Sequence, residues 1–275
     1  MTLPPDFQFS QGSLQDYSDC PRRFQLRYLL QLQWPAIEAQ PPLENERRLQ
    51  QGAAFHRLVH QHMLGIPAED LTRSISDPDL QRWWDSYENA SLALSPARYP
   101  EIVLSAPLGK HRLMARYDLI TVEPGEEAGI LDWKTSRKLP KRKWLKARLQ
   151  SKVYPYLLVR AGAHLNQGQP FEPKQVEMTY WFPEFPDDPI RFSYDATQHA
   201  AAEDELTALV EEIAKLGDED LPLTPDERRC RYCPYRSLCE RGIEAGPLDE
   251  ADDEFELEAE FDVAVDFDQI AEIEY

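Results

Sequence analysis

The chain has 275 residues, of which 42% are hydrophobic and 11% aromatic, so it can bury a full core and is expected to form one domain with appendages. No stretch approaches the roughly eighteen apolar residues of a membrane span, and the N-terminus lacks the basic start and apolar run of a signal peptide. These absences predict a cytoplasmic protein that makes no membrane contact. The formal net charge of -19 argues against binding to nucleic acid only if the acids are evenly spread, and they are not.

The acidic excess is concentrated at the C-terminal end. Residues 247–275 hold thirteen Asp and Glu and no Lys or Arg, mixed with single apolar residues. Because this composition is typical of a weakly ordered segment, we expect a domain over residues 1–245 and a disordered acidic tail over 246–275. The tail either solubilises the protein or mimics DNA, competing for a basic groove or docking a partner.

Helices are predicted first along the chain, from apolar and aromatic residues at helical spacing. Within residues 11–34, Pro21 separates a short helix from a longer one. Two further helices are expected near Glu44–Leu64 and Asp79–Leu94.

The apolar period then changes to two, which indicates strands. Three consecutive strands, separated by short turns, are predicted over 101–108, 111–122 and 128–135. A helix over 141–161, strands over 174–183 and 190–195, and an amphipathic helix over 197–217 complete the order. This order predicts a single α/β or α+β domain with its core over residues 98–195.

The third strand carries an acid and a base in an otherwise apolar run, GILDWKTS. Asp132 and Lys134 are two apart and therefore share a face of a strand, and Asp118 of the preceding strand could lie opposite Asp132. Two neighbouring carboxylates repel unless a proton or cation lies between them, and oxygen ligands suit Mg²⁺ or Mn²⁺. Lys134 would then orient or deprotonate an attacking water. The alternative is an ordinary ion pair at a sheet edge.

A basic segment follows this strand. From Trp133 to Phe171 there is no acid and there are ten bases, which is the electrostatic footprint of a phosphate backbone. A solvated helix face is the alternative interpretation. The candidate DNA-binding residues are Arg137, Lys138, Lys141, Arg142, Lys143, Lys146, Arg148 and Lys152.

Taken together, these motifs resemble the PD-(D/E)XK nuclease superfamily and its RecB-like branch. The resemblance lies in Asp118, in Asp132-Trp133-Lys134, and in a helix carrying Gln150 and Tyr154 four residues apart. It implies a restriction-endonuclease-like fold, a central mixed sheet flanked by helices, with Gln150 and Tyr154 over the substrate phosphates.

The resemblance also implies a set of metal ligands. His56 in GAAFH matches the histidine of the family's G-x-x-x-H helix, and Glu101 matches an acidic position at the start of the first strand. The implied Mg²⁺ or Mn²⁺ site uses Asp118, Asp132, His56 and the backbone carbonyl of Trp133. His60 and His62 are either further ligands or surface histidines.

The four cysteines suggest a second metal centre. Cys230, Cys233 and Cys239 cluster near the C-terminal end, whereas Cys20 lies in the N-terminal helical segment, so one four-thiolate site would clasp the two ends. Spacing alone fits either Zn²⁺ or a [4Fe-4S] cluster. The pattern Cys-Pro-x-x-Phe with three late cysteines is similar to that of AddB-like iron-sulfur nucleases and CRISPR-associated adaptation nucleases, and this similarity implies the cluster.

These observations predict a metal-dependent DNA nuclease, in particular a single-strand-preferring exonuclease of DNA repair or recombination. The chain has no G-x-x-x-x-G-K-[ST] phosphate loop, so a helicase or repair partner would supply any unwinding. A CRISPR adaptation nuclease and a non-catalytic DNA-binding or assembly module are the alternatives. The sequence leaves the oligomeric state open.

Overall fold

A computed structural model describes residues 3–4, 6–32, 42–90, 92, 94–217 and 219–246, without the side chains of 42–46. The predicted acidic tail lies outside these ranges apart from Gly246. None of the described helices combines the length and apolarity needed to cross a membrane.

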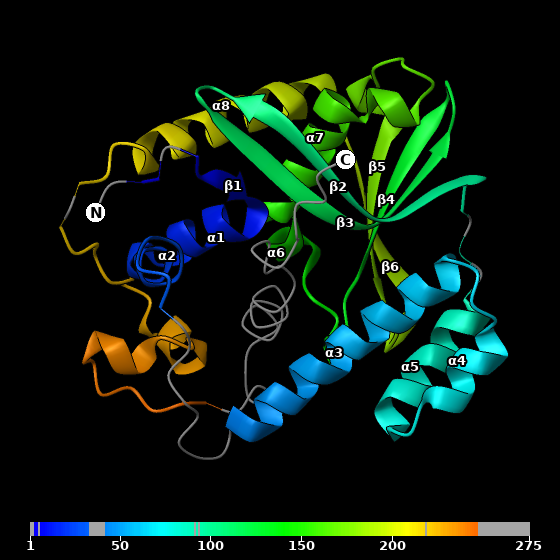
Figure 1. The fold of residues 1–275 in the computed structure, drawn as a ribbon, viewed down its shortest axis with the longest axis horizontal. Coiled ribbons are helices and arrows are strands. Elements are labelled where there is room, and N and C mark those ends of the chain that lie inside the picture. Colours follow the sequence, from blue (N-terminus) through cyan, green and yellow to red (C-terminus); the bar gives the residue numbers. More distant parts are fainter. Residues whose placement is uncertain are drawn as a thin grey trace.

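A six-stranded mixed sheet forms the centre of the fold (Figure 1). Its order is β1-β3-β4-β5-β6, and β2 pairs with β3. Strands β2, β3 and β4 form the predicted antiparallel meander, and β5 lies parallel to β4 after a helical crossover. Strand β1, which runs parallel to β3, was not predicted. The strands are β1 (Gln8–Ser10), β2 (Ala97–Leu108), β3 (His111–Glu123), β4 (Glu127–Trp133), β5 (Val176–Phe182) and β6 (Phe185–Ser193).

The helices agree with the predicted order, with two exceptions. The expected single helix over 141–161 is two helices, because Arg148 adopts an extended backbone (φ -66°, ψ 143°) that ends the first. Helix α4 was not predicted. The α-helices are α1 (Gln11–Asp19), α2 (Pro21–Phe24), α3 (Pro42–Met63), α4 (Ala68–Ser74), α5 (Pro78–Asn89), α6 (Arg142–Ala147), α7 (Gln150–Ala161) and α8 (Ala196–Ile213).

Short turns of other helical types complete the described part. A π-helix, Gln25–Leu29, continues α2. Two 3-10 helices, Glu227–Tyr232 and Arg236–Cys239, contain Cys230 and Cys239, and Cys233 lies between them. Two more 3-10 helices, Gly162–Leu165 and Pro173–Gln175, connect α7 to β5.

The two faces of the sheet bury separate cores, because strand side chains alternate between faces. Ile120 and Ile130 pack with α7 and α8, whereas Leu119 and Leu131 pack with α3, α4 and α5. The second core is rich in aromatic rings, including Trp83, Trp84, Trp133 and Trp181. The sheet is therefore sandwiched between two helical layers (Figure 1), in agreement with the fold class predicted from the sequence.

Candidate active site

The two candidate acids lie where β3 and β4 separate. The antiparallel pairing ends at Leu119–Leu131, and one step further it would place Asp118 opposite Asp132. Instead of continuing the ladder, the backbone N–H of Trp133 donates to Oδ2 of Asp118 at 2.9 Å. The last backbone donor of β4 is thus used to orient a carboxylate.

Asp132 forms a buried ion pair with Lys134, whose Nζ lies 2.7 Å from Oδ2. Nε2 of Gln150, the first residue of α7, donates to Oδ1 of Asp132 at 2.6 Å. Burial raises the pKa of the Asp132 carboxyl to about 6; the Lys134 ammonium opposes this shift and the Asp118 carboxylate adds to it. Since β4 lies between β3 and β5, this pair is not at a sheet edge.

Helix α3 brings His56 to the same place. Its Nδ1 is 3.3 Å from Oδ1 of Asp118. Burial by itself would lower the pKa of His56, but the Asp118 carboxylate raises it above its ordinary value. Burial would likewise raise the pKa of Asp118, but His56 and Lys134 hold it below the usual range. The close approach of α3 depends on Gly52, because a Cβ there would lie 2.9 Å from Oγ1 of Thr135.

Glu101 completes the group from β2. Its backbone has φ +51°, in the left-handed region that residues other than glycine rarely adopt, although Glu101 lies within a strand. Oε2 of Glu101 is 3.2 Å from Nε of Arg116. Burial, followed by the Asp118 carboxylate, raises the pKa of Glu101 above its ordinary value. Strain of this kind at a carboxylate next to other acids is typical of a functional position.

Within the described residues, ligand atoms of His56, Glu101 and Asp118 lie within 4.8 Å of one another. Two carboxylates and an imidazole suit a divalent cation such as Mg²⁺ or Mn²⁺. Asp132 is outside this group, and its carboxylate contacts Lys134 and Gln150 instead. The described residues therefore fit a divalent metal held mainly from β2, β3 and α3.

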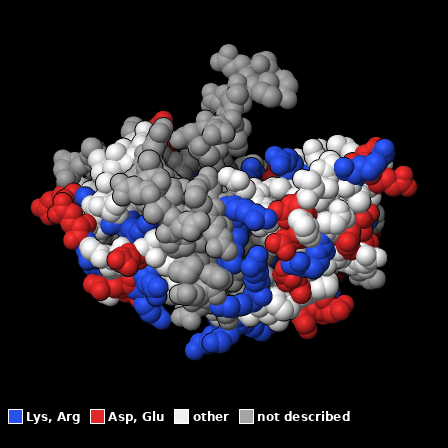
Figure 2. Space-filling view, turned by 90° about the horizontal axis from the view of Figure 1, so that it is seen from below, with Lys and Arg blue, Asp and Glu red and all other residues white. Residues whose placement is uncertain are grey.

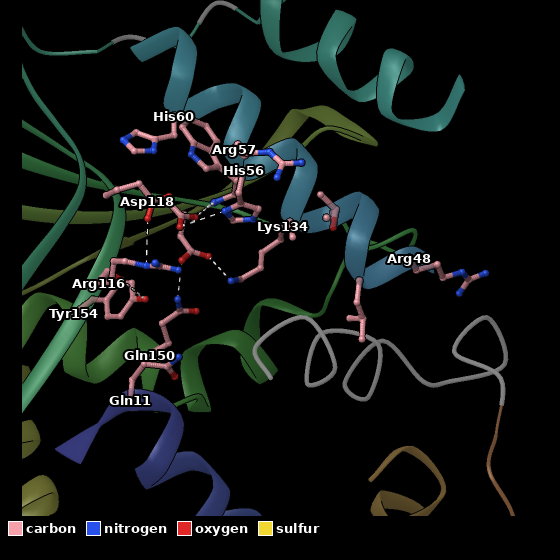
Figure 3. Close-up of a pocket in the computed structure, with 17 residues that line it drawn as sticks. Gln11, Arg48, His56, Arg57, His60, Arg116, Asp118, Lys134, Gln150 and Tyr154 are labelled. Carbon is pink, nitrogen blue, oxygen red and sulfur yellow. Dashed lines mark hydrogen bonds and ion pairs between the residues drawn. The ribbon is translucent and has the colours of Figure 1, made fainter. Parts of the chain in front are cut away.

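These residues line a cavity of about 270 Å³. In Figure 3 the side chains of His56, Asp118, Lys134 and Gln150 point toward its centre from different elements. Tyr154 also lines it, one turn after Gln150, and its hydroxyl donates to the Arg116 carbonyl at 2.8 Å. The predicted face of α7 therefore lies over the acids.

The other two histidines of α3, His60 and His62, point to different parts of the structure. His60 lines the cavity, and burial together with Arg116 lowers its pKa. His62 faces away, with Nδ1 3.0 Å from the hydroxyl of Tyr87 and its ring edge-on to Trp84. His62 therefore belongs to the aromatic core of the α3–α5 layer.

Three arginines of the cavity were not predicted from the sequence. Arg48, Arg57 and Arg116 line it together with the acids. Arg116 could have been found, because it precedes Asp118 by two residues on a strand and so shares its face. Arg48 and Arg57 lie on α3, where sequence alone does not give the direction of the side chain.

Five of the eight predicted DNA-binding residues are exposed to solvent. Arg148 is buried, and its Nη1 lies 3.5 Å from Oδ2 of Asp19. Lys152 is half-buried and forms an ion pair with Glu205 at 2.6 Å. The exposed residues are Arg137, Lys141, Arg142, Lys143 and Lys146, and Lys138 is half-buried.

The four cysteines line one small cavity of about 20 Å³, although Cys20 is some two hundred residues from the others in the chain. Cys20 and Cys230 are buried, and Cys233 and Cys239 are half-buried. Burial, followed by the neighbouring Cys20 and Cys230, raises the pKa of the Cys239 thiol. Arg23, Arg229 and Arg236 line the same cavity, and Nη1 of Arg241 lies 3.7 Å from Sγ of Cys230.

Comparison with known proteins identifies the family. The family model of the PD-(D/E)XK nuclease superfamily matches residues 8–240. The chain belongs to this superfamily, whose members use divalent metals to cleave nucleic acids.

Two solved structures match the chain with low scores. The crystal structure of a protein described as a putative exonuclease from Eubacterium rectale matches with a TM-score of 0.46 and 9% identity, covering 81% of this chain and 85% of that one. The crystal structure of SSO0001 matches with a TM-score of 0.32 and 16% identity, covering 53% of this chain and 61% of that one. No curated protein matches the sequence.

Proposed function

We propose that this protein is a metal-dependent DNA nuclease of the RecB-like branch, acting as an exonuclease that prefers single strands in DNA repair or recombination. The observation that carries the proposal is the meeting of His56, Glu101 and Asp118 with the buried Asp132–Lys134 pair in one cavity. A nuclease needs acids for a metal and a cation for the attacking water, and both are within this cavity.

His56, Glu101 and Asp118 would hold the divalent ion, with Asp132 and the backbone carbonyl of Trp133 as the further ligands expected from the sequence. The ion, when bound, would supply charge neutralisation at the scissile phosphate and activation of water. The chain's own residues set the geometry. Asp118 is oriented by the N–H of Trp133 and by His56, so its position is fixed before any ligand arrives.

Lys134 and the α7 face have separate roles. Nζ of Lys134 would orient the attacking water and stabilise the negative charge that develops on phosphorus. Nε2 of Gln150 donates to the Asp132 carboxylate at 2.6 Å. Tyr154, which lines the same cavity, would contact the DNA strand there. Both Asp132 and Lys134 are buried, which restricts the positions that the two side chains can adopt.

The exposed bases of the 137–146 segment would bind flanking phosphates, together with Lys138. Figure 2 shows Lys and Arg gathered near the middle of one face, with acids toward both ends. Arg148 is excluded from this set because it is buried against Asp19. Lys152 would contribute only after leaving Glu205.

Four cysteines around one cavity support a metal group that clasps the two ends of the domain, and the resemblance of the cysteine pattern to iron-sulfur nucleases favours a [4Fe-4S] cluster over Zn²⁺. Arginines next to the sulfur atoms would offset the negative charge of the thiolates. The cluster would act as a cross-link that closes a loop of about two hundred residues and removes entropy from the unfolded chain. Iron content and visible absorbance of protein purified without oxygen test this assignment, and a colourless protein that contains zinc would overturn it.

The domain boundaries and cellular setting belong to the same proposal. A domain over residues 1–245 with its core at 98–195 would end before the acidic tail. The protein would act in the cytoplasm with a helicase or repair partner.

The test of activity compares wild type with Asp132→Ala on labelled single-stranded and duplex DNA, with Mg²⁺ or Mn²⁺ added. We expect wild type to degrade single strands from an end and the variant to lose at least about a hundredfold in rate. Asp85→Ala, which removes an exposed carboxylate on α5, is the matched control and should keep full activity. Metal-independent DNA binding without cleavage would favour the non-catalytic module.

A further inference from the structure

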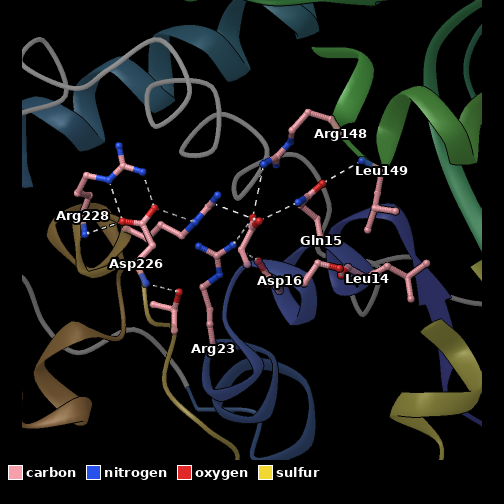
Figure 4. A network of polar contacts seen from close by, with 12 residues as sticks. Leu14, Gln15, Asp16, Arg23, Arg148, Leu149, Asp226 and Arg228 are labelled. Atoms are coloured by element: carbon pink, nitrogen blue, oxygen red, sulfur yellow. Dashed lines mark hydrogen bonds and ion pairs between the residues drawn. The ribbon is translucent and has the colours of Figure 1, made fainter. Parts of the chain in front are cut away.

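A buried network of charged side chains connects α1, the cysteine segment and the start of α7. Figure 4 shows Gln15, Arg23 and Arg148 directed toward one region. Its centre is Asp19, the last residue of α1, which is buried. Burying a charge is costly unless it is paired, so such a network restricts where its members can lie.

At one end, the network sets the beginning of α7. The backbone N–H of Leu149 donates to Oε1 of Gln15 at 3.0 Å, and Nε2 of Gln15 donates to Oδ1 of Asp19 at 2.9 Å. Arg148, whose extended backbone ends α6, lies 3.5 Å from Oδ2 of Asp19. Since no side chain caps α7, these contacts from α1 define where its first turn starts.

The first residue of that turn is Gln150, which holds Asp132. Its Nε2 is 2.6 Å from Oδ1 of the carboxylate, and both side chains are almost fully buried. A shift of the first turn of α7 would therefore move or break this hydrogen bond. Asp19 is thus linked to the candidate active site through Gln15 and Arg148, the first turn of α7, and Gln150.

At the other end, the network touches the cysteine site. Asp19 immediately precedes Cys20, and Arg229 immediately precedes Cys230. Nη1 of Arg229 lies 3.2 Å from Oδ1 of Asp19. The Asp19 carboxylate therefore lies next to Cys20 in the sequence and contacts Arg229, the neighbour of Cys230. It also reaches α7 through Arg148 and Gln15.

We propose that Asp19 is a positioning residue that couples the state of the cysteine site to the nuclease site, an inference that rests on the proposed function. When the four cysteines hold their metal group, Arg229 and Asp19 are fixed and the first turn of α7 presents Gln150 to Asp132. When that group is lost, Arg229 is released, and Asp19 no longer fixes Arg148 and Gln15. Integrity of the cysteine site then regulates the active site through position, without any electron transfer.

The test uses the full-length protein purified without oxygen. Asp19→Asn removes the charge that binds Arg148 and Arg229 while keeping the shape of the side chain. Glu184→Gln is the control, because Glu184 is a half-buried carboxylate that pairs with Arg82 and Trp83 and contacts none of these residues. Each variant is measured for kcat and KM on a single-stranded oligonucleotide, for Mn²⁺ affinity by electron paramagnetic resonance, and for iron per chain.

We expect Asp19→Asn to lower kcat or Mn²⁺ affinity by about ten- to a hundredfold per iron-loaded chain, the range for partners that orient a metal ligand, with KM for DNA unchanged. Glu184→Gln should lose far less. Equal losses in the two variants would show that only general stability is affected and would overturn the proposal.

A double-mutant cycle separates positioning from a structural role. If Asp19 acts through Gln150, then Asp19→Asn in a Gln150→Ala background has no further effect on Mn²⁺ affinity, whereas independent effects would add and refute the coupling. If wild type cleaves no DNA, the proposed function fails separately. The coupling is then judged on Mn²⁺ affinity alone, and an unchanged affinity in Asp19→Asn overturns it.

Discussion

At Glu101 the backbone conformation is expected to reverse the usual order of stability between alanine and glycine in a strand. Alanine normally stabilises a strand by about 0.5 to 1 kcal/mol over glycine, because glycine loses more conformational entropy on folding. At φ +51° an alanine would carry the left-handed strain of about 1 to 2 kcal/mol that a glycine avoids. Glu101→Gly should therefore be more stable than Glu101→Ala, by roughly 0.5 to 1 kcal/mol.

Both Glu101 variants lose the same carboxylate and the same contact with Arg116, so their difference isolates the backbone. The assay is urea unfolding followed by circular dichroism, with equal m-values required before free energies are compared. Val103, on the same strand and paired with Arg116, supplies the control, where Val103→Ala should be more stable than Val103→Gly. An alanine variant at 101 that matches or exceeds the glycine variant would refute the assignment of strain. Both variants at 101 should bind Mn²⁺ more weakly than wild type, because a ligand is missing.

Three further outcomes are expected. Gly52→Ala should lower the rate of DNA cleavage about tenfold, because the added Cβ would push α3 and His56 away from Thr135. Adding Thr135→Ala, which removes Oγ1, should restore much of that rate. Rate assays of the single and double variants check both outcomes. Asp77→Ala should cost about 1 kcal/mol at pH 7 by uncapping α5. Burial would raise the pKa of Asp77, but hydrogen bonds from Gln51 and the Leu80 N–H hold it below 3.8, so its ionised form stabilises the fold above that pH. The stability advantage of wild type over Asp77→Asn should shrink as pH falls below 3.8, measured by thermal unfolding across pH. Deleting 247–275 should leave DNA affinity and its salt dependence unchanged, and tighter binding would instead support a DNA mimic.

The strand pattern predicted how the two acids of the candidate site lie relative to each other. Alternation along β3 and β4 was sufficient to place Asp118 near Asp132, because antiparallel neighbours joined by a short turn have little freedom in register. Helical spacing likewise placed Gln150 and Tyr154 on one face, and the family match gives the mixed sheet a second, independent basis.

Other features depend on contacts that sequence does not contain. The break between α6 and α7 occurs in a segment of high helix propensity, because Asp19 and Gln15, more than a hundred residues away, bind Arg148 and Leu149. The left-handed backbone of Glu101 has no local signal either, since glutamate gives no indication of positive φ. In both places a tertiary interaction overrides local preference.

Trp133, between the acid and the base, gives the protein an optical reporter of its own site. Its indole is edge-on to Trp181, with ring centroids 5.6 Å apart, and its backbone N–H holds Asp118. Any adjustment of Asp118 when an ion binds is therefore transmitted to a fluorophore in a fixed aromatic environment. Ion binding to the cavity is therefore expected to change the intrinsic emission, and Trp133→Phe would show how much of that change comes from this one of the six tryptophans.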